Sequence, residues 1–135
     1  MTDPDAAARP TPHALTDIGS VQPVRIWKEV TARIVQSTLI TMAVVDIPPG
    51  GEVPAHRHEN EQVGLCLTGS LTFTVGNETR VCGPGGAWRI LANVPHEVVA
   101  GPDGAVVVEV FSPVRSDWYG ATPEPDAPLR WPPAP

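Results

Sequence analysis

Three histidines and one glutamine have the spacing of a metal site. His56 and His58 stand two positions apart, Gln62 follows shortly after them, and His96 comes much later in the chain. Side chains at i and i+2 point the same way on an extended strand, because successive strand residues alternate between faces. Imidazole nitrogens and an amide oxygen are ligands that divalent transition metals accept. The pattern predicts one divalent ion, with metal–nitrogen distances of about 2.0–2.2 Å.

Each histidine segment follows a turn rich in proline and glycine. The run Pro48–Gly51 precedes His56, and the run Gly83–Gly86 precedes the segment that ends at His96. Clusters of this kind mark tight turns between strands. We therefore expect two similar turn–strand units that present their histidines to one site.

The segments between these turns have the composition of strands. Residues 33–47 hold aliphatic pairs among threonines and predict one or two strands. Residues 64–67 and 71–75 predict two strands of a hairpin-like meander, with a turn at residues 68–69. The valine-rich run 105–111 predicts a strand covered on both sides. Strands that close into a barrel leave an interior that can hold one small ligand.

Composition predicts one small domain with different material at its two ends. The 135 residues include 17 prolines and 12 glycines, which favours short strands joined by tight turns. We expect a flexible arm at residues 1–22, a barrel at residues 23–120, and a proline-rich tail at residues 121–135 that is extended or disordered.

Charge and cysteine usage limit the kinds of partner and the compartment that we expect. The net charge of −6 and the lack of a basic run argue against binding to nucleic acid. No apolar run approaches the ~18 residues of a membrane-spanning helix, and no apolar segment of a signal peptide is evident. Cys66 and Cys82 fit no disulfide framework. We expect two reduced thiols in a cytoplasmic protein that binds a small molecule.

The two histidine segments resemble the two motifs of the cupin family. The first motif has G, five residues, H-x-H, three or four residues, E, six residues and G, which matches Gly50 to Gly69 with Gln62 at the glutamate position. The second, P-G-D-x-x-x-I-P-x-N-x-P-H, matches Pro84 to His96. The resemblance covers about residues 25–117. It implies an all-β fold, the double-stranded β-helix that is also called the cupin or jelly-roll barrel.

The resemblance also implies the ligand set, with departures from the family pattern. The implied ligands of a Zn, Ni, Mn or Fe ion are His56, His58, Gln62 and His96. The family spacing favours Gln62 as the fourth ligand, with Glu61 as the alternative. Gln62 replaces a glutamate and removes a negative charge, so the ion keeps close to its full charge and is a stronger Lewis acid. Two further departures, Gly86 for Asp and Leu91 for Pro, affect only turn detail.

Glu109 is a carboxylate within the valine-rich run, on the same strand face as Phe111. Burial of a carboxylate is unfavourable unless it is paired or used. Glu109 therefore either faces solvent on an edge strand or faces the cavity near the metal.

The segment from Glu109 to Arg115 is similar to the D-x-F-S-P-x-R ending of small cupins that linearise or ketonise unsaturated uronates, and of cupin polyketide cyclases. Glu109 stands where that ending has Asp. The resemblance implies an active site lined by Glu109, Phe111 and Arg115. Glu109 would transfer a proton, Arg115 would hold a carboxylate or enolate oxygen, and Phe111 would contact the substrate.

The tryptophans have two interpretations. Trp88 either lines the barrel mouth, where it would bind substrate, or fills the core. For Trp27, Trp118 and Trp131 we expect packing or anchoring of the tail.

Together these residues favour an enzyme. The leading hypothesis is keto–enol isomerisation or aldol-type cyclisation of a small oxygenated metabolite, polyketide-like or uronate-like. The alternatives are an Fe-dependent dioxygenase and a non-catalytic small-molecule-binding protein, and a Glu109 remote from the metal would favour the last. A small core and an apolar N-terminal strand also predict a homodimer that pairs through Val24–Val30.

Overall fold

The computed structural model describes residues 9–134, and this part of the chain is almost entirely β-structure. The two helices in it are short 3₁₀ turns, η1 (Ile18–Ser20) and η2 (Ser116–Trp118). The strands are β1 (Val24–Arg25), β2 (Thr31–Gln36), β3 (Thr41–Ile47), β4 (Glu52–His56), β5 (Glu61–Val75), β6 (Glu78–Cys82), β7 (Ala87–Ile90), β8 (His96–Ser112) and β9 (Thr122–Pro123). The predicted all-β barrel is confirmed.

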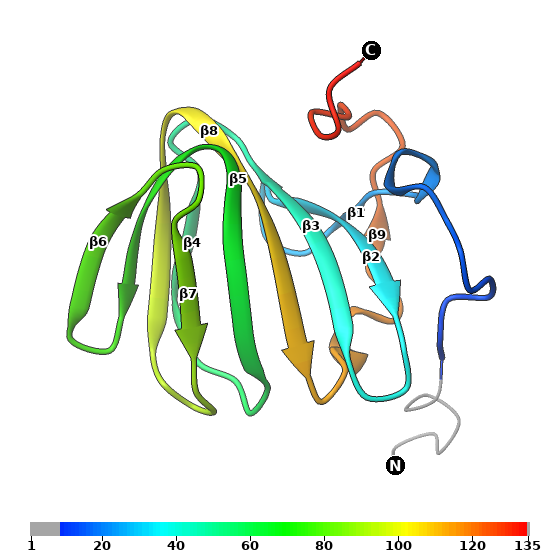
Figure 1. Cartoon of the computed structure of the whole chain (residues 1–135), viewed down its shortest axis with the longest axis horizontal. Coiled ribbons are helices and arrows are strands. Elements are labelled where there is room, and N and C mark those ends of the chain that lie inside the picture. Colours follow the sequence, from blue (N-terminus) through cyan, green and yellow to red (C-terminus); the bar gives the residue numbers. More distant parts are fainter. Residues whose placement is uncertain (1–8, 135) are drawn as a thin grey trace.

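Two long strands, β5 and β8, belong to both layers of the barrel. In the first layer the start of β5 and the end of β8 lie side by side, with β7 next to β5 and β3, β2, β1 and β9 continuing beyond β8. In the second layer the end of β5 pairs with β6, and the start of β8 pairs with β4. Figure 1 shows both strands arching over the top of the molecule, so that the layers face each other beneath the arch. All pairings are antiparallel.

The arch forms where glycines let β5 and β8 bend together. The pairing of β5 with β8 shifts register between Cys66 and Thr68 and again between Gly69 and Leu71. Gly69 has a φ of 76°, and a Cβ there would collide with the carbonyl oxygen of Gly104, whose own φ is 71°. The predicted turn at residues 68–69 is therefore wrong. Irregular pairing bends one continuous strand at that point.

Alternation along the strands builds the core. Residues 33–47 form the hairpin of β2 and β3, one of the two predicted outcomes. The run 105–111 forms only the second half of β8, and it is covered less fully than predicted, because Val108 and Val110 are half-buried. Both cysteines are buried free thiols. The inward-facing apolar side chains include Ala43, Val45, Cys66, Leu71, Phe73, Ile90, Val98 and Val107.

The C-terminal segment is bound to the barrel through a short strand, so the extended alternative for the tail describes it and the disordered alternative does not. β9 pairs with β1, the Glu124 backbone N–H donates to the carbonyl of Pro23 at 2.8 Å, and Glu124 forms an ion pair with Arg25 at 3.0 Å. The sheet thus extends beyond residue 120. β1 lies between β2 and β9, so Val24 and Arg25, the first residues of the predicted dimer contact at Val24–Val30, present no free sheet edge. Homodimer formation itself stays a prediction, which light scattering can check.

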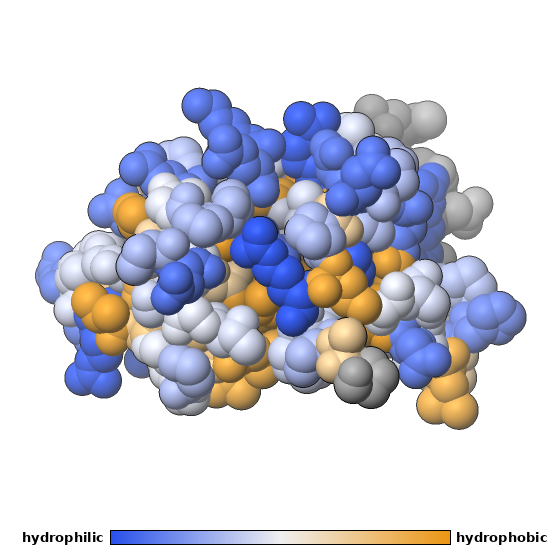
Figure 2. All heavy atoms as spheres, turned by 90° about the horizontal axis from the view of Figure 1, so that it is seen from above, coloured by the Kyte–Doolittle hydropathy of each residue, from blue (hydrophilic) through white to orange (hydrophobic). Residues whose placement is uncertain are grey.

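The N-terminal segment also contacts the barrel. The Thr11 N–H donates to the carbonyl of Gln36, and the Gln36 N–H donates to the Thr11 hydroxyl, both at 2.9 Å. The part of the predicted flexible arm before residue 9 lies outside the described residues. No helix in residues 9–134 has the length and apolar character needed to cross a bilayer. Seen from above, polar residues cover much of the surface, with apolar patches between them (Figure 2).

Candidate metal centre

Three histidines meet at the end of the barrel opposite the arch. His56 ends β4 and His96 begins β8, and the two residues are opposed in the pairing of these strands. His58 lies in the loop after β4, so the expected extended strand ends at the first histidine, but the two rings still converge. The candidate ligand atoms of all three histidines lie within 4.8 Å of one another. The histidine part of the predicted metal site is therefore assembled.

Each imidazole is oriented by a nearby backbone carbonyl. Nδ1 of His56 lies 2.8 Å from the carbonyl oxygen of Pro54, that of His58 lies 2.9 Å from Asn60, and that of His96 lies 2.8 Å from Val94. A carbonyl can only accept, so Nδ1 carries the proton and Nε2 keeps a free lone pair. Carbonyl-oriented histidines of this kind are typical of metal ligands.

The Nε2 atoms have too few hydrogen-bond donors around them for a site that holds only protein. Nε2 of His96 is buried and has no hydrogen-bond partner in the described part of the chain. Nε2 of His58 lies 3.1 Å from the amide oxygen of Gln62, although both atoms are acceptors in this arrangement. A cation among these atoms would remove both conflicts. The residues present therefore fit a divalent metal ion.

Gln62, rather than Glu61, is the residue that faces the histidines. The two are neighbours on β5 and point to opposite sides, Gln62 being buried and Glu61 exposed. Since Gln62 also contacts His58, the structure favours it as the fourth candidate ligand.

Two of the three histidines, His58 and His96, are held in the neutral form that a metal requires. Burial lowers the pKa of His96 to about 4. The pKa of His58 is also lowered, first by burial and then by the positive charge of Arg115. Both side chains are therefore unprotonated at neutral pH.

Glu109 lies inside the barrel behind Gln62, and the solvent-facing alternative is excluded. The amide nitrogen of Gln62 donates to Oε2 of Glu109 at 2.7 Å, and the Trp88 indole nitrogen donates to Oε1 at 3.0 Å and to Oε2 at 3.1 Å. Burial raises the pKa of Glu109 to about 8, although these donors and the charge of Arg115 favour the ionised form.

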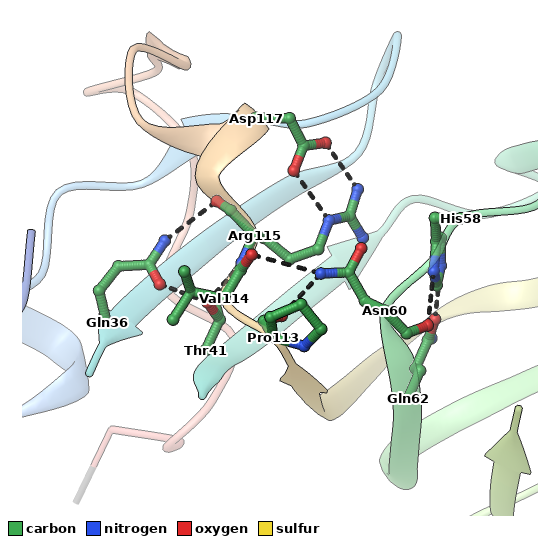
Figure 3. Close-up of polar contacts among 9 residues, drawn as sticks. All are labelled: Gln36, Thr41, His58, Asn60, Gln62, Pro113, Val114, Arg115 and Asp117. Carbon is green, nitrogen blue, oxygen red and sulfur yellow. Dashed lines mark hydrogen bonds and ion pairs between the residues drawn. The ribbon is translucent and has the colours of Figure 1, made fainter. Parts of the chain in front are cut away.

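Arg115 lies beside the histidines but is held by its own segment. Its Nε and Nη2 donate to the two carboxylate oxygens of Asp117 at 3.0 and 2.9 Å (Figure 3). The guanidinium carbon lies 4.1 Å from the centre of the Trp118 ring and 4.8 Å from that of Phe111. Phe111 in turn packs edge-on against His58 at 5.9 Å between ring centres. Nη1 is the guanidinium nitrogen that these bonds leave for a ligand.

Asn60 links the loop that carries His58 to the segment that carries Arg115. Its side-chain nitrogen donates to the carbonyl of Pro113 at 2.6 Å and to that of Val114 at 3.3 Å, as Figure 3 shows. No motif in the sequence marks Asn60 as a residue of the site. Its position between two ligand candidates was the one available signal, because both partners lie more than fifty positions away.

A cavity of about 60 Å³ joins these groups, room for a few waters or the reacting end of a small ligand. Trp27 and Trp118 pack against the core, as expected, and they also line this cavity. Trp88 is not among its lining residues and sits behind Glu109, packed on Phe73 at 4.7 Å between ring centres. The core-filling alternative therefore describes Trp88 better than the predicted substrate contact. The polar residues of the lining are His56, Gln62, His96, Glu109 and Arg115.

A larger hollow of about 330 Å³ lies elsewhere, between β1 and the C-terminal segment. Its lining mixes acidic and basic side chains, among them Arg25, Asp46 and Arg130. The buried polar groups of the centre converge on the smaller cavity, so we assign the candidate site to that cavity.

Comparisons with known proteins agree with this fold. The family described as "Cupin domain" matches residues 43–111. The pectin degradation protein KdgF of Dickeya dadantii is 29% identical over 80 residues, which cover 58% of this chain and 73% of that protein. An RmlC-like cupin from Shewanella frigidimarina has a TM-score of 0.74 at 20% identity, covering 78% of this chain and 96% of the other. The polyketide cyclase RemF from Streptomyces resistomycificus has a TM-score of 0.66 at 26% identity, covering 75% and 79%.

Proposed function

The chain belongs to the cupin family, and we propose that it is a metal-dependent enzyme for keto–enol chemistry on a small oxygenated substrate. The reaction would be an isomerisation or an aldol-type cyclisation. The observation that carries the proposal is the convergence of three kinds of group on one cavity. These are imidazoles, of which that of His96 has a buried Nε2 atom without a partner, a buried carboxyl group, and a guanidinium whose Nη1 is not used by Asp117.

His56, His58, His96 and Gln62 would hold a divalent ion, with Zn, Ni, Mn and Fe as candidates. Such an ion supplies Lewis acidity toward a carbonyl oxygen of the substrate. The four ligand candidates are all uncharged, so the protein does not reduce that acidity.

The other groups of the cavity would bind the substrate and move its proton. Nη1 of Arg115 is placed to hold an anionic oxygen, since Asp117 and two aromatic rings fix the rest of the guanidinium. Phe111 forms an apolar wall between Arg115 and His58. Glu109 is the carboxyl group of the cavity, and its pKa of about 8 suits proton transfer near neutral pH.

The related proteins support substrates rich in carbonyl and hydroxyl groups. KdgF is named for pectin degradation and RemF for polyketide cyclisation. We propose a uronate-like or polyketide-like substrate for this chain. A Glu109 remote from the metal would favour the non-catalytic alternative, and its direct contact with Gln62 removes that support.

Deuterium exchange tests the proposal. Metal-loaded protein in D₂O is incubated with small 1,2- and 1,3-dicarbonyl compounds and hydroxy acids, and NMR follows the hydrogens on carbons next to the carbonyl groups. We expect protein-dependent exchange that disappears with His96→Ala. Oxygen uptake without exchange would instead favour the Fe-dependent dioxygenase. The absence of both exchange and oxygen uptake with every compound tested would contradict an enzymatic role.

A further inference from the structure

Three buried side chains, Trp88, Glu109 and Gln62, form a hydrogen-bonded chain that leads from the core to the candidate metal centre. Trp88 on β7 donates to Glu109 on β8, and Glu109 accepts from the amide of Gln62 on β5. All three are nearly removed from solvent, with exposed fractions of 9%, 6% and 7%. The chain thus connects three neighbouring strands within the first layer of the barrel.

Gly64 makes this chain possible. It lies opposite Trp88 in the pairing of β5 with β7 and opposite Glu109 in the pairing of β5 with β8. A Cβ at position 64 would lie 2.6 Å from Oε2 of Glu109 and closer still to Nε1 of Trp88. Both distances are too short for real atoms, so a side chain here would push Trp88 and Glu109 apart. Trp88 and Glu109 can meet because position 64 of β5 has no side chain.

The donors and acceptors in this hydrogen-bonded chain decide which end of the Gln62 amide faces the histidines. An amide can be placed either way round, and only its partners distinguish the oxygen from the NH₂ group. Both oxygens of Glu109 accept N–H bonds here, so the amide turns its NH₂ group toward Glu109. Its oxygen then faces His58 at 3.1 Å. When Glu109 is ionised, the reverse placement would set the amide oxygen against a carboxylate oxygen and direct a donor toward the metal position.

We propose that Trp88 and Glu109 are positioning residues that fix the Gln62 amide with its oxygen turned toward the three histidines. Trp88 holds the carboxylate in place, the carboxylate binds the NH₂ group, and the carbonyl oxygen becomes the fourth ligand. This inference rests on the proposed metal centre and gives Glu109 a task separate from proton transfer. Outer partners of this kind contribute about 10–100-fold to metal affinity in other metal sites.

Cobalt binding tests the inference, because Co²⁺ can be followed by calorimetry and by its visible absorption. Trp88→Phe removes the indole N–H and keeps an aromatic ring, and Gly64→Ala adds the Cβ that separates the pair. We expect each variant to bind Co²⁺ about 10–100-fold more weakly than the unaltered protein. We also expect the Co²⁺ spectrum of saturated Trp88→Phe to approach that of Gln62→Ala, since both lose the ordered fourth ligand.

Matched substitutions separate positioning from a loss of stability. Trp131→Phe makes the same change at a residue that does not line the cavity, and Gly83→Ala adds a Cβ where no atom lies within 4 Å. Both controls should keep the affinity and spectrum of the unaltered protein. A residue with a purely structural role would alter thermal stability but leave the spectrum of the saturated protein unchanged.

The possible outcomes distinguish a failure of the positioning role from a failure of the proposed metal centre. Unaltered protein that binds Co²⁺, with Trp88→Phe and Gly64→Ala matching it in affinity and spectrum, would overturn the positioning role alone. A Gln62→Ala variant with the affinity and spectrum of the unaltered protein would overturn it as well, because Gln62 would not be a ligand. Unaltered protein that binds no Co²⁺ would overturn both the inference and the metal centre.

Discussion

The three histidines and Gln62 lie together at the candidate metal centre, but the protein orients them in different ways. Each histidine is fixed by a carbonyl two positions away in the sequence, as Nδ1 of His96 is by Val94. Gln62 is fixed by Glu109, which lies 47 positions away and is itself held by Trp88. The first kind of support forms wherever the local backbone forms. The second exists only when three strands are paired in the correct register.

This difference has consequences for the stability of the centre. Local carbonyls survive most side-chain substitutions, because every residue carries one. The Glu109 support depends on particular side chains and on the missing side chain of Gly64. We therefore expect the histidines to tolerate changes around them and the fourth ligand to be sensitive to changes in the core.

The same difference explains how much of the molecule the sequence predicts. The spacing of His56 and His58 and the turns before them identify the histidine cluster, because local patterns decide it. Parity along the valine-rich strand predicts that Glu109 points inward. Its contact with Trp88 depends on strand register, which the single sequence does not fix.

The errors at the level of the fold have the same cause. The bend of β5 at Gly69 has the residues of a turn, but close approach to Gly104 makes it an arch between two layers. The ordered C-terminal segment depends on pairing with β1. Proline-rich composition indicates that such a segment is extended, whereas it says nothing of the strand to which it binds.

The largest effect should follow removal of a locally supported ligand. His96→Ala deletes one of three imidazoles, so we expect affinity for Zn²⁺ or Co²⁺ to fall by more than the ~100-fold that loss of an outer partner causes. Calorimetric titration measures this. An affinity within a few-fold of the unaltered protein would show that His96 is not a ligand.

Glu109→Gln should lower turnover by about 10²–10⁴ at saturating metal, because a carboxamide cannot accept a proton from the substrate. The measurement is steady-state kinetics on a substrate found by the exchange assay, with metal content checked in each sample. Turnover close to that of the unaltered protein would leave Glu109 as a positioning residue alone.

Arg115→Lys should raise KM about 10-fold and change kcat less. Lysine keeps the charge but loses the planar fork and its contacts with Asp117, and a hydrogen bond to a charged group is worth about 1.5–3 kcal/mol. The ratio of the two kinetic constants provides the check. A fall in kcat with unchanged KM would instead assign Arg115 to the chemical step.

The stability of the metal-free protein should depend on pH through Glu109. Its pKa is raised by burial from 4.5 to about 8, so between these values the folded chain binds more protons than the unfolded chain. The contribution of Glu109 is therefore fully present below about pH 4.5 and is lost as the pH rises through about 8. Urea unfolding with chelator at pH 6 and pH 9 should show the unaltered protein losing stability relative to Glu109→Gln. An equal difference at both values would contradict the raised pKa.

The smallest effect should come from a side chain next to a local support. Val94→Ala keeps the carbonyl that binds Nδ1 of His96. We expect less than a 3-fold change in Co²⁺ affinity, about 0.6 kcal/mol or less. A loss as large as that expected for Trp88→Phe would remove the distinction between local and long-range support.

Anomalous diffraction from crystals grown with Co²⁺, recorded at the cobalt absorption edge, tests the central claim most directly. We predict one peak per chain, about 2.0–2.2 Å from Nε2 of His56, His58 and His96, with the amide oxygen of Gln62 as the fourth ligand. A peak on Glu61, a peak away from the histidines, or no ordered cobalt would contradict the account.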